Sequence, residues 1–275
     1  MSTKVIAEYI WLDGSSGFRS KCRTLEVKTQ IDIEVDNLPL WNYDGSSTGQ
    51  SEASNSDVTL QPVAVFSDPF RGQNSVFVLC ATYDCDGNPL ANNHRHNAVR
   101  LFNQDSDAQP WFGIEQEYFM MNPNTKWPLG FPPNGYPKPQ GNYYCSVGTL
   151  NNFGRKIADL HYKMCLASGV KIAGINAETA PGQWEFQVGP CEGIEAGDHL
   201  TMARYILERV SEFSSILIDY SPKPVKGDWN GSGCHVNYST RHMRKGLGDK
   251  RGIDFIQDAI KNLEKTHSEH MEVYG

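Results

Sequence analysis

The stretch WFGIEQEYF at residues 111–119 combines strong β-forming residues with two carboxylates, Glu115 and Glu117. Its aromatic and β-branched residues predict a strand, which we expect over 111–121. Successive side chains of a strand point to opposite faces, so the two glutamates share one face, about 7 Å apart. At an effective dielectric of 20, like charges at that distance repel by about 2 kcal/mol. The face is therefore either open to water, the commoner arrangement for such a pair alone, or a place where cations bind.

The sequence on the two sides of this stretch differs in pattern. Before about residue 90, short strands are separated by Gly, Pro, Asn and Ser clusters, which predicts a small, mainly β part. Later, strands alternate with amphipathic helices. We expect strands at 5–12, 24–27, 58–66, 75–83, 170–176, 183–188 and 234–238. We expect helices over 155–168, from Asp198 as N-cap, and from Ile253. The expected domains are residues 3–87 and 94–275, with an ordered loop at 122–142 that is rich in Pro, Gly and aromatic residues.

The composition is that of a folded globular protein, with 39% hydrophobic and 21% charged residues. A net charge of -7 and the lack of a basic stripe argue against a nucleic-acid partner. No apolar run approaches the roughly 20 residues of a membrane helix, so no membrane partner is expected. The first residues show neither a signal-peptide nor a transit-peptide pattern, which favours a cytoplasmic location.

Two further glutamates interrupt segments that otherwise favour burial. Glu178 follows the strand candidate GINA, and Glu185 lies within QWEFQVGP. A histidine, His235, follows a glycine-rich turn in GDWNGSGCHVN; taken alone, it is more often a satisfied core histidine than a ligand. Several carboxylates with one imidazole favour Mg²⁺ or Mn²⁺ over Zn²⁺. The whole set predicts a metal-dependent phosphoryl-transfer site, with the candidate ligands Glu115, Glu117, Glu178, Glu185 and His235.

The usual nucleotide-binding loops are missing from the sequence, which contains neither GxxxxGK[ST] nor GxGxxG in a strand-turn-helix setting. Backbone around Gly231 and Gly233, with metal ions acting on the phosphates, is the available substitute cradle for ATP. The segment WNYDGSST at 41–48 predicts a turn, and turn chemistry alone does not favour a catalytic role for Asp44.

Seven motifs, in this order, resemble the eukaryotic type of the glutamine synthetase family: WNYDGSSTGQ, WFGIEQEY, PQGNYYCSVG, GINAE, QWEFQVGP, MARYILERV and KGDWNGSGCH. The resemblance runs from Val5 to Gly275. It implies an α+β fold, with an N-terminal β-grasp domain followed by a catalytic domain built on a curved antiparallel sheet with flanking helices. It also implies a homo-oligomer whose active sites lie between adjacent subunits.

The resemblance further implies roles for individual residues. Glu115 and His235 would hold the metal that engages the ATP phosphates, and Glu117, Glu178 and Glu185 would hold the metal nearer glutamate. The nucleotide-binding residues would be Glu115, Glu185, Asn237, Tyr238 and Ser239. The glutamate-binding residues would be Glu117, Asp228, Trp229, Asn230 and Gly231. Asp44, supplied by the adjacent subunit, would help to deprotonate ammonium, which overrides the interpretation from turn chemistry.

The implied reaction is the ligation of ammonia to L-glutamate with ATP as co-substrate, through γ-glutamyl phosphate, with two or more Mg²⁺ or Mn²⁺ ions per site. Family members continue beyond the position of Gly275 with a flap, arginines and a further glutamate ligand, so we expect weak or no ligase activity from this chain alone. Two alternatives remain open. One is a catalytically inactive relative with a structural or interaction role, and the other is a ligase for an amine or another amino acid.

Overall fold

The computed structural model describes residues 2–28 and 33–272. It contains two compact units, each assembled from three separate segments of the chain. The first unit comprises Met1–Leu101, Asp159–Ile172 and Gly197–Phe213. The second comprises Phe102–Ala158, Ala173–Ala196 and Ser214–Gly275.

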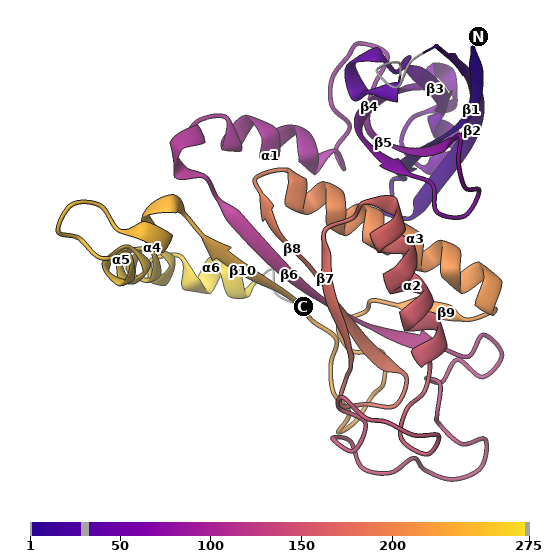
Figure 1. The fold of residues 1–275 in the computed structure, drawn as a ribbon, viewed down its shortest axis with the longest axis vertical. Helices are drawn as coiled ribbons and strands as arrows, with labels where there is room; N and C mark the ends of the chain where they lie inside the picture. Colours follow the sequence, from indigo (N-terminus) through magenta and orange to yellow (C-terminus); the bar gives the residue numbers. More distant parts are fainter. Residues whose placement is uncertain (1, 29–32, 273–275) are drawn as a thin grey trace. The chain divides into compact units, whose positions relative to one another are not determined.

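The first unit contains a five-stranded sheet in the order β2-β1-β5-β4-β3. Its strands are β1 (Thr3–Leu12), β2 (Phe18–Val27), β3 (Trp41–Asp44), β4 (Asp57–Ser67) and β5 (Ser75–Tyr83). The β1–β5 pair is parallel, and the other pairs are antiparallel. In Figure 1 these strands curl round one another. Alternate side chains of β1 enter one core on the same face of the sheet, and they include Ala7, Tyr9 and Trp11.

Two long helices, α2 (Arg155–Ser168) and α3 (Glu195–Ser214), contribute most of their residues to the first unit. The Ser168 hydroxyl donates to the Ser67 carbonyl at 2.7 Å, which ties the end of α2 to the end of β4. The imidazole of His161 lies 2.9 Å from the Ala203 carbonyl, so α2 and α3 also contact each other. Helix α1 (His94–Phe102) precedes the second unit.

A buried carboxylate, Glu8 of β1, joins the sheet to α3 within the first unit. Glu8 is 2% exposed and accepts hydrogen bonds from Ser20 (2.7 Å), Tyr205 (2.6 Å) and Arg209 (3.2 Å), and from Arg71. Burial opposes its ionisation, but the hydrogen bonds from Tyr205, Ser20 and Arg71 outweigh burial and hold the pKa of Glu8 below its ordinary value. The charge of Glu8 is therefore compensated inside the chain.

The second unit contains a sheet in the order β10-β6-β8-β7, with β9 also paired to β6. Its strands are β6 (Trp111–Met121), β7 (Ile172–Ala177), β8 (Gln183–Glu192), β9 (Leu217–Asp219) and β10 (Cys234–Ser239). Strand β6 is antiparallel to β8, β9 and β10. Fully buried Tyr118, Trp184 and Phe186 lie on one face of the β6–β8 pair. Fully buried Phe119 lies on the opposite face and packs with Met121, Ala180 and Val225. The helices that follow β10 are α4 (Arg241–Lys245), α5 (Gly252–Glu264) and α6 (His267–Met271).

Short 3₁₀ turns lie between these elements, at η2 (Val35–Asn37), η3 (Gly45–Thr48), η4 (Ala53–Asn55) and η5 (Ser106–Ala108). Among the described residues, none of the helices combines the length and the apolar character needed to cross a membrane.

Most of the expected elements are confirmed, two expectations need correction, and some elements were not predicted. The bounds of β5, β6 and α2 agree with the prediction. Helix α3 begins at Glu195, so Asp198 is not its N-cap; its carboxylate instead pairs with the Arg95 guanidinium at 2.8 Å. Half of the turn predicted at 41–48 is the strand β3. Helices α1, α4 and α6 and strand β9 were not predicted, because all four are short.

Candidate metal and substrate site

Three glutamates converge in the second unit. Glu117 lies on β6, Glu178 follows β7 and Glu185 lies on β8, and each offers an oxygen within 4.8 Å of the others. The β6–β8 register places Glu117 directly opposite Glu185. Glu178 joins them because its backbone N–H donates to the Gln183 carbonyl at 2.9 Å, across the turn between β7 and β8. We call these three residues the carboxylate cluster.

The carboxylate cluster is poorly exposed to water. Glu178 and Glu185 are 7% and 9% exposed, and the side chain of Glu117 is 13% exposed. Burial raises the pKa of Glu178, and the neighbouring charges of Glu117 and Glu185 add to the effect. Burial also raises the pKa of Glu185, with the charges of Glu115 and Glu117 acting in the same direction. The site therefore concentrates negative charge where water can screen it least.

Neutral amides hold the cluster in place. Asn176 Nδ2 donates to Glu178 Oε1 at 2.9 Å, and Gln187 Nε2 donates both to Asn176 Oδ1 at 2.7 Å and to Glu185 Oε1. These donors orient the carboxylates but do not neutralise them. Hard oxygen ligands of this kind are those that Mg²⁺ and Mn²⁺ prefer, and a divalent cation would balance the charge. The donor set therefore fits a divalent metal ion.

Glu115 and His235 lie beside the carboxylate cluster. The β6–β10 register pairs them directly, and the Glu115 carboxylate accepts a hydrogen bond from Asn237 at 2.7 Å. His235 has a side chain 64% exposed, and its Nε2 is 4.0 Å from Glu117 Oε1. His235 is thus an exposed strand residue, unlike a satisfied core histidine.

The expected nucleotide-binding residues of β10 occupy both faces of that strand. Asn237 contacts Glu115 on the metal-site face. Tyr238, on the other face, is 52% exposed, and its ring lies 5.2 Å from that of Phe112. The Ser239 hydroxyl accepts a hydrogen bond from Arg244 at 3.0 Å, at the end of the strand.

The segment Asp228–Gly231, expected to bind glutamate, is anchored beside the cluster. Trp229 packs against Phe131, with ring centroids 5.0 Å apart, so the loop predicted at 122–142 is ordered here by aromatic contact. The Asn230 backbone N–H donates to Gln140 Oε1 at 2.7 Å. Asp228 is exposed.

Two further contacts join this segment to the cluster. Gly233 N donates to Glu117 Oε2 at 2.9 Å, and Gln183 Nε2 donates to the Gly231 carbonyl at 2.8 Å. Sequence reasoning missed Gln183, although an amide at the start of an apolar strand is a signal of a buried hydrogen-bonding role.

Asp44 belongs to the first unit, where it caps the turn η3. Its carboxylate is exposed and accepts hydrogen bonds from the Ser46 backbone N–H (3.0 Å) and hydroxyl (2.6 Å). The Ser46 hydroxyl and backbone bonds lower the pKa of Asp44, so it is ionised near neutral pH. A base role is compatible with this charge state, and it stays a prediction.

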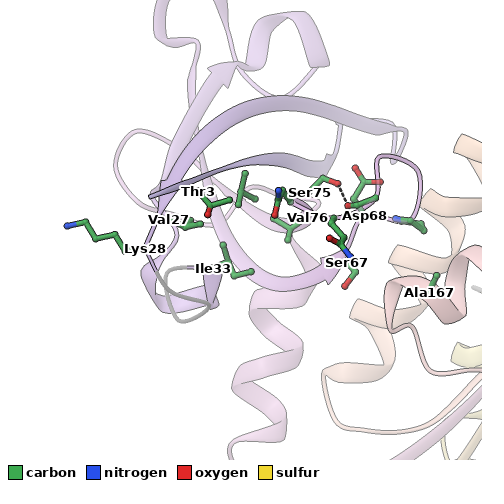
Figure 2. Close-up of a pocket in the computed structure, with 14 residues that line it drawn as sticks. Thr3, Val27, Lys28, Ile33, Ser67, Asp68, Ser75, Val76 and Ala167 are labelled. Atoms are coloured by element: carbon green, nitrogen blue, oxygen red, sulfur yellow. Dashed lines mark hydrogen bonds between the residues drawn. The ribbon is translucent and has the colours of Figure 1, made fainter. Parts of the chain in front are cut away.

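The first unit also contains a pocket of about 620 Å³. Figure 2 shows it between β1, β5 and the segment after β4, with Ala167 of α2 at one side and the Lys28 side chain directed away from the other lining residues. The carboxylate of Asp68, one of its lining residues, is already occupied by Arg71 and by the Phe70 backbone. None of the described residues that line this pocket is a predicted site residue.

Comparison with known proteins places the chain in one family. Residues 2–85 match the family model described as "Glutamine synthetase, beta-Grasp domain", and residues 93–248 match "Glutamine synthetase, catalytic domain". "Glutamine synthetase" of Neurospora crassa is 54% identical over 272 residues, covering 99% of this chain and 74% of that protein. "Glutamine synthetase cytosolic isozyme 1-3" of Arabidopsis thaliana is 50% identical over 275 residues, covering 99% of this chain and 76% of that protein.

"Glutamine synthetase, chloroplastic" of Brassica napus is 52% identical over 275 residues, again covering 99% of this chain. The chain spans 63% of the length of that relative. The two matched family models, the α+β architecture and the high identity across almost the whole sequence agree with one another. The chain therefore belongs to the glutamine synthetase family.

Proposed function

We propose that the chain acts in glutamine biosynthesis as an ATP-dependent glutamate-ammonia ligase that assimilates ammonia. The observation that carries the proposal is the carboxylate cluster of Glu117, Glu178 and Glu185, whose donors are neutral amides and backbone N–H groups. A buried cluster of this kind carries uncompensated charge that a divalent cation would balance. Family membership supports the reaction, and the relatives named glutamine synthetase support glutamate, ammonium and ATP as substrates.

Two or more Mg²⁺ or Mn²⁺ ions are proposed per site. Glu117, Glu178 and Glu185 would hold one of them, and Glu115 and His235 would hold another. When bound, such ions reduce the repulsion between the glutamate carboxylate and the triphosphate and draw negative charge from the phosphates.

The chain's own residues would place the substrates. In the proposed arrangement, Asp228, Trp229, Asn230 and Gly231 bind glutamate, and Asn237, Tyr238 and Ser239 bind the nucleotide together with Glu115 and Glu185. In this reaction the glutamate side-chain carboxylate attacks the γ-phosphate of ATP and releases ADP, and ammonia then displaces phosphate from the resulting acyl phosphate to give glutamine. Asp44 of a neighbouring copy would take the proton from ammonium, so the active protein is a homo-oligomer. The relatives named cytosolic isozymes support a cytoplasmic location, although other relatives are named chloroplastic.

Calorimetric titration of ADP with and without Mn²⁺ tests the metal site. We expect the wild type to bind ADP only when Mn²⁺ is present. Glu117→Ala should bind ADP weakly even with Mn²⁺, because the removal of one cluster oxygen ligand weakens the metal site. Glu264→Ala, which removes an exposed glutamate of α5, is the matched control and should bind like the wild type. A wild type that binds neither Mn²⁺ nor Mg²⁺ would contradict the proposed site. A wild type that binds the metal ion but shows no metal-dependent ADP binding would instead favour an inactive relative.

A further inference from the structure

Gln183 opens β8 and is 1% exposed. The β6–β8 register places it opposite Phe119, whose packing neighbours include Met121, Ala180 and Val225. A buried amide without hydrogen-bond partners would lower the free energy of unfolding by about 1–3 kcal/mol. The hydrogen-bond partners of Gln183 therefore indicate its role.

The amide of Gln183 makes four hydrogen bonds within the second unit. Its Nε2 donates to Glu117 Oε2 at 3.3 Å and to the Gly231 carbonyl at 2.8 Å. Its Oε1 accepts from Ala180 N at 3.3 Å and from Asn230 Nδ2 at 3.4 Å. An amide has two N–H donors and one carbonyl oxygen with two lone pairs, so its full capacity is used. The side chain thereby ties one carboxylate of the cluster to residues 230–231.

Glu117 is held through one of its two oxygens. Oε2 accepts from Gln183 Nε2 and also from Gly233 N, at 2.9 Å. The other oxygen, Oε1, lies 4.0 Å from His235 Nε2. Two donors on one oxygen fix the rotation of a carboxylate, and the second oxygen keeps its lone pairs for a cation.

We propose that Gln183 is a positioning residue that couples the metal centre to the glutamate-binding segment. The inference rests on the proposed function, which places a divalent cation at the carboxylate cluster and glutamate at Asp228–Gly231. A cation that holds Glu117 also holds the Gln183 amide in the orientation that supports Gly231 and Asn230. The cation and glutamate then favour the same arrangement, so each raises the affinity for the other.

Gln183→Met tests this coupling, because methionine has a similar length and volume and cannot make the four hydrogen bonds. We expect the Mn²⁺ affinity, measured from the EPR signal of free Mn²⁺, to fall about 10- to 100-fold, as is typical when the partner of a metal ligand is removed. The line shape of bound Mn²⁺ should also change. Saturating Mn²⁺ should tighten glutamate binding by about fivefold or more in the wild type, and this factor should be clearly smaller in the variant.

Gln50→Met is the matched control. The Gln50 amide also makes several hydrogen bonds, to Tyr43, Thr48 and the Leu12 carbonyl, but in the first unit, so neither Mn²⁺ affinity nor the coupling factor should change. Gln183→Asn is a second test variant should Gln183→Met fail to fold. It keeps an amide but is one methylene too short to reach both Glu117 and Gly231.

The outcomes separate this inference from the proposed function. Wild-type Mn²⁺ affinity and wild-type coupling in a folded Gln183 variant would overturn the role of Gln183 alone. A wild type that does not bind Mn²⁺ would overturn the proposed function, and the coupling with it.

Discussion

Buried carboxylates of this chain have two kinds of partner. Glu8 accepts hydrogen bonds from Arg71 and Arg209, whose positive charges balance its own. Glu178 and Glu185 accept theirs from Asn176 and Gln187, which carry no charge. A buried charge without a counter-charge is expensive, so it is retained only where something else supplies the compensation. Glu8 therefore contributes to stability by itself, and the cluster depends on a ligand.

Replacing Glu8 with glutamine should destabilise the first unit. The substitution keeps the shape of the side chain but removes the charge opposite two guanidinium groups, and we expect the free energy of unfolding to fall by about 1.5–3 kcal/mol at pH 7. The pKa of Glu8 is lower in the folded chain than its ordinary value of 4.5. The stability from this carboxylate is therefore fully present above the ordinary value and is lost as the pH falls through the folded-state pKa.

Urea unfolding at several pH values measures the effect of Glu8→Gln. The difference between wild type and variant should be largest near neutral pH and should shrink below pH 4.5. Glu26→Gln, at an exposed position of β2, should change stability by less than about 0.5 kcal/mol at any of these values. A difference that stays constant with pH would show that the ionised form of Glu8 is not what stabilises the unit.

At the level of elements, the turn between β7 and β8 positions two of the cluster residues. Gly182 adopts φ +72° in this turn, and a Cβ there would lie 2.7 Å from the Leu129 carbonyl oxygen and 2.9 Å from its nitrogen. These are backbone atoms that cannot move aside easily. Only glycine fits, and the residues that follow it are Gln183 and, two positions later, Glu185.

Gly182→Ala should therefore weaken both stability and metal binding. We expect a loss of about 3 kcal/mol or more, because the left-handed backbone costs about 1–2 kcal/mol for a non-glycine residue and the backbone clash adds to it. Displacement of β8 should also lower Mn²⁺ affinity about tenfold or more. Gly148→Ala is the control, since Gly148 has φ +92° with nothing within 4 Å of the added Cβ. Gly148→Ala should lower stability only by the cost of the left-handed backbone and should leave Mn²⁺ affinity unchanged. Equal losses of stability in Gly148→Ala and Gly182→Ala would refute the steric argument.

Local pattern predicted the elements better than the contacts between them. The alternation of β6 was enough to place Glu115 and Glu117 on one face. That Glu185 lies opposite Glu117 follows from the β6–β8 register, which depends on pairing across about 70 residues and leaves no local signal. The same limit explains Asp198, whose cap-like position is overridden by a charge pair with Arg95, far away in sequence.

At the level of the whole molecule, the proposed site needs residues from both compact units. Asp44 lies in the first unit and the carboxylate cluster in the second. In the proposed oligomer, each active site combines Asp44 of one copy with the carboxylate cluster of a neighbouring copy.

Mixing two inactive variants tests the shared site. Asp44→Asn and Glu117→Ala should each abolish glutamine formation, because one removes the proposed base and the other a metal ligand. Dissociated and reassembled together, they should recover about one quarter of the wild-type rate, since random neighbours combine an intact Asp44 with an intact Glu117 at that frequency. Asp57→Asn is the control for Asp44→Asn, because Asp57 lies opposite Asp44 in the β3–β4 pair. Asp57→Asn should form glutamine without any mixing. No recovery in the mixture would indicate that each site is built within one copy.

The Glu8 network also bears on how the chain is made. Its partners lie 63, 197 and 201 residues further along the chain, at Arg71, Tyr205 and Arg209. A ribosome adds about 5–20 residues per second, so β1 waits roughly 10–40 s after synthesis before Tyr205 exists. During that interval the strand carries an ionised glutamate whose final environment has not been made. The surroundings of Glu8 are thus completed only once α3 has been made.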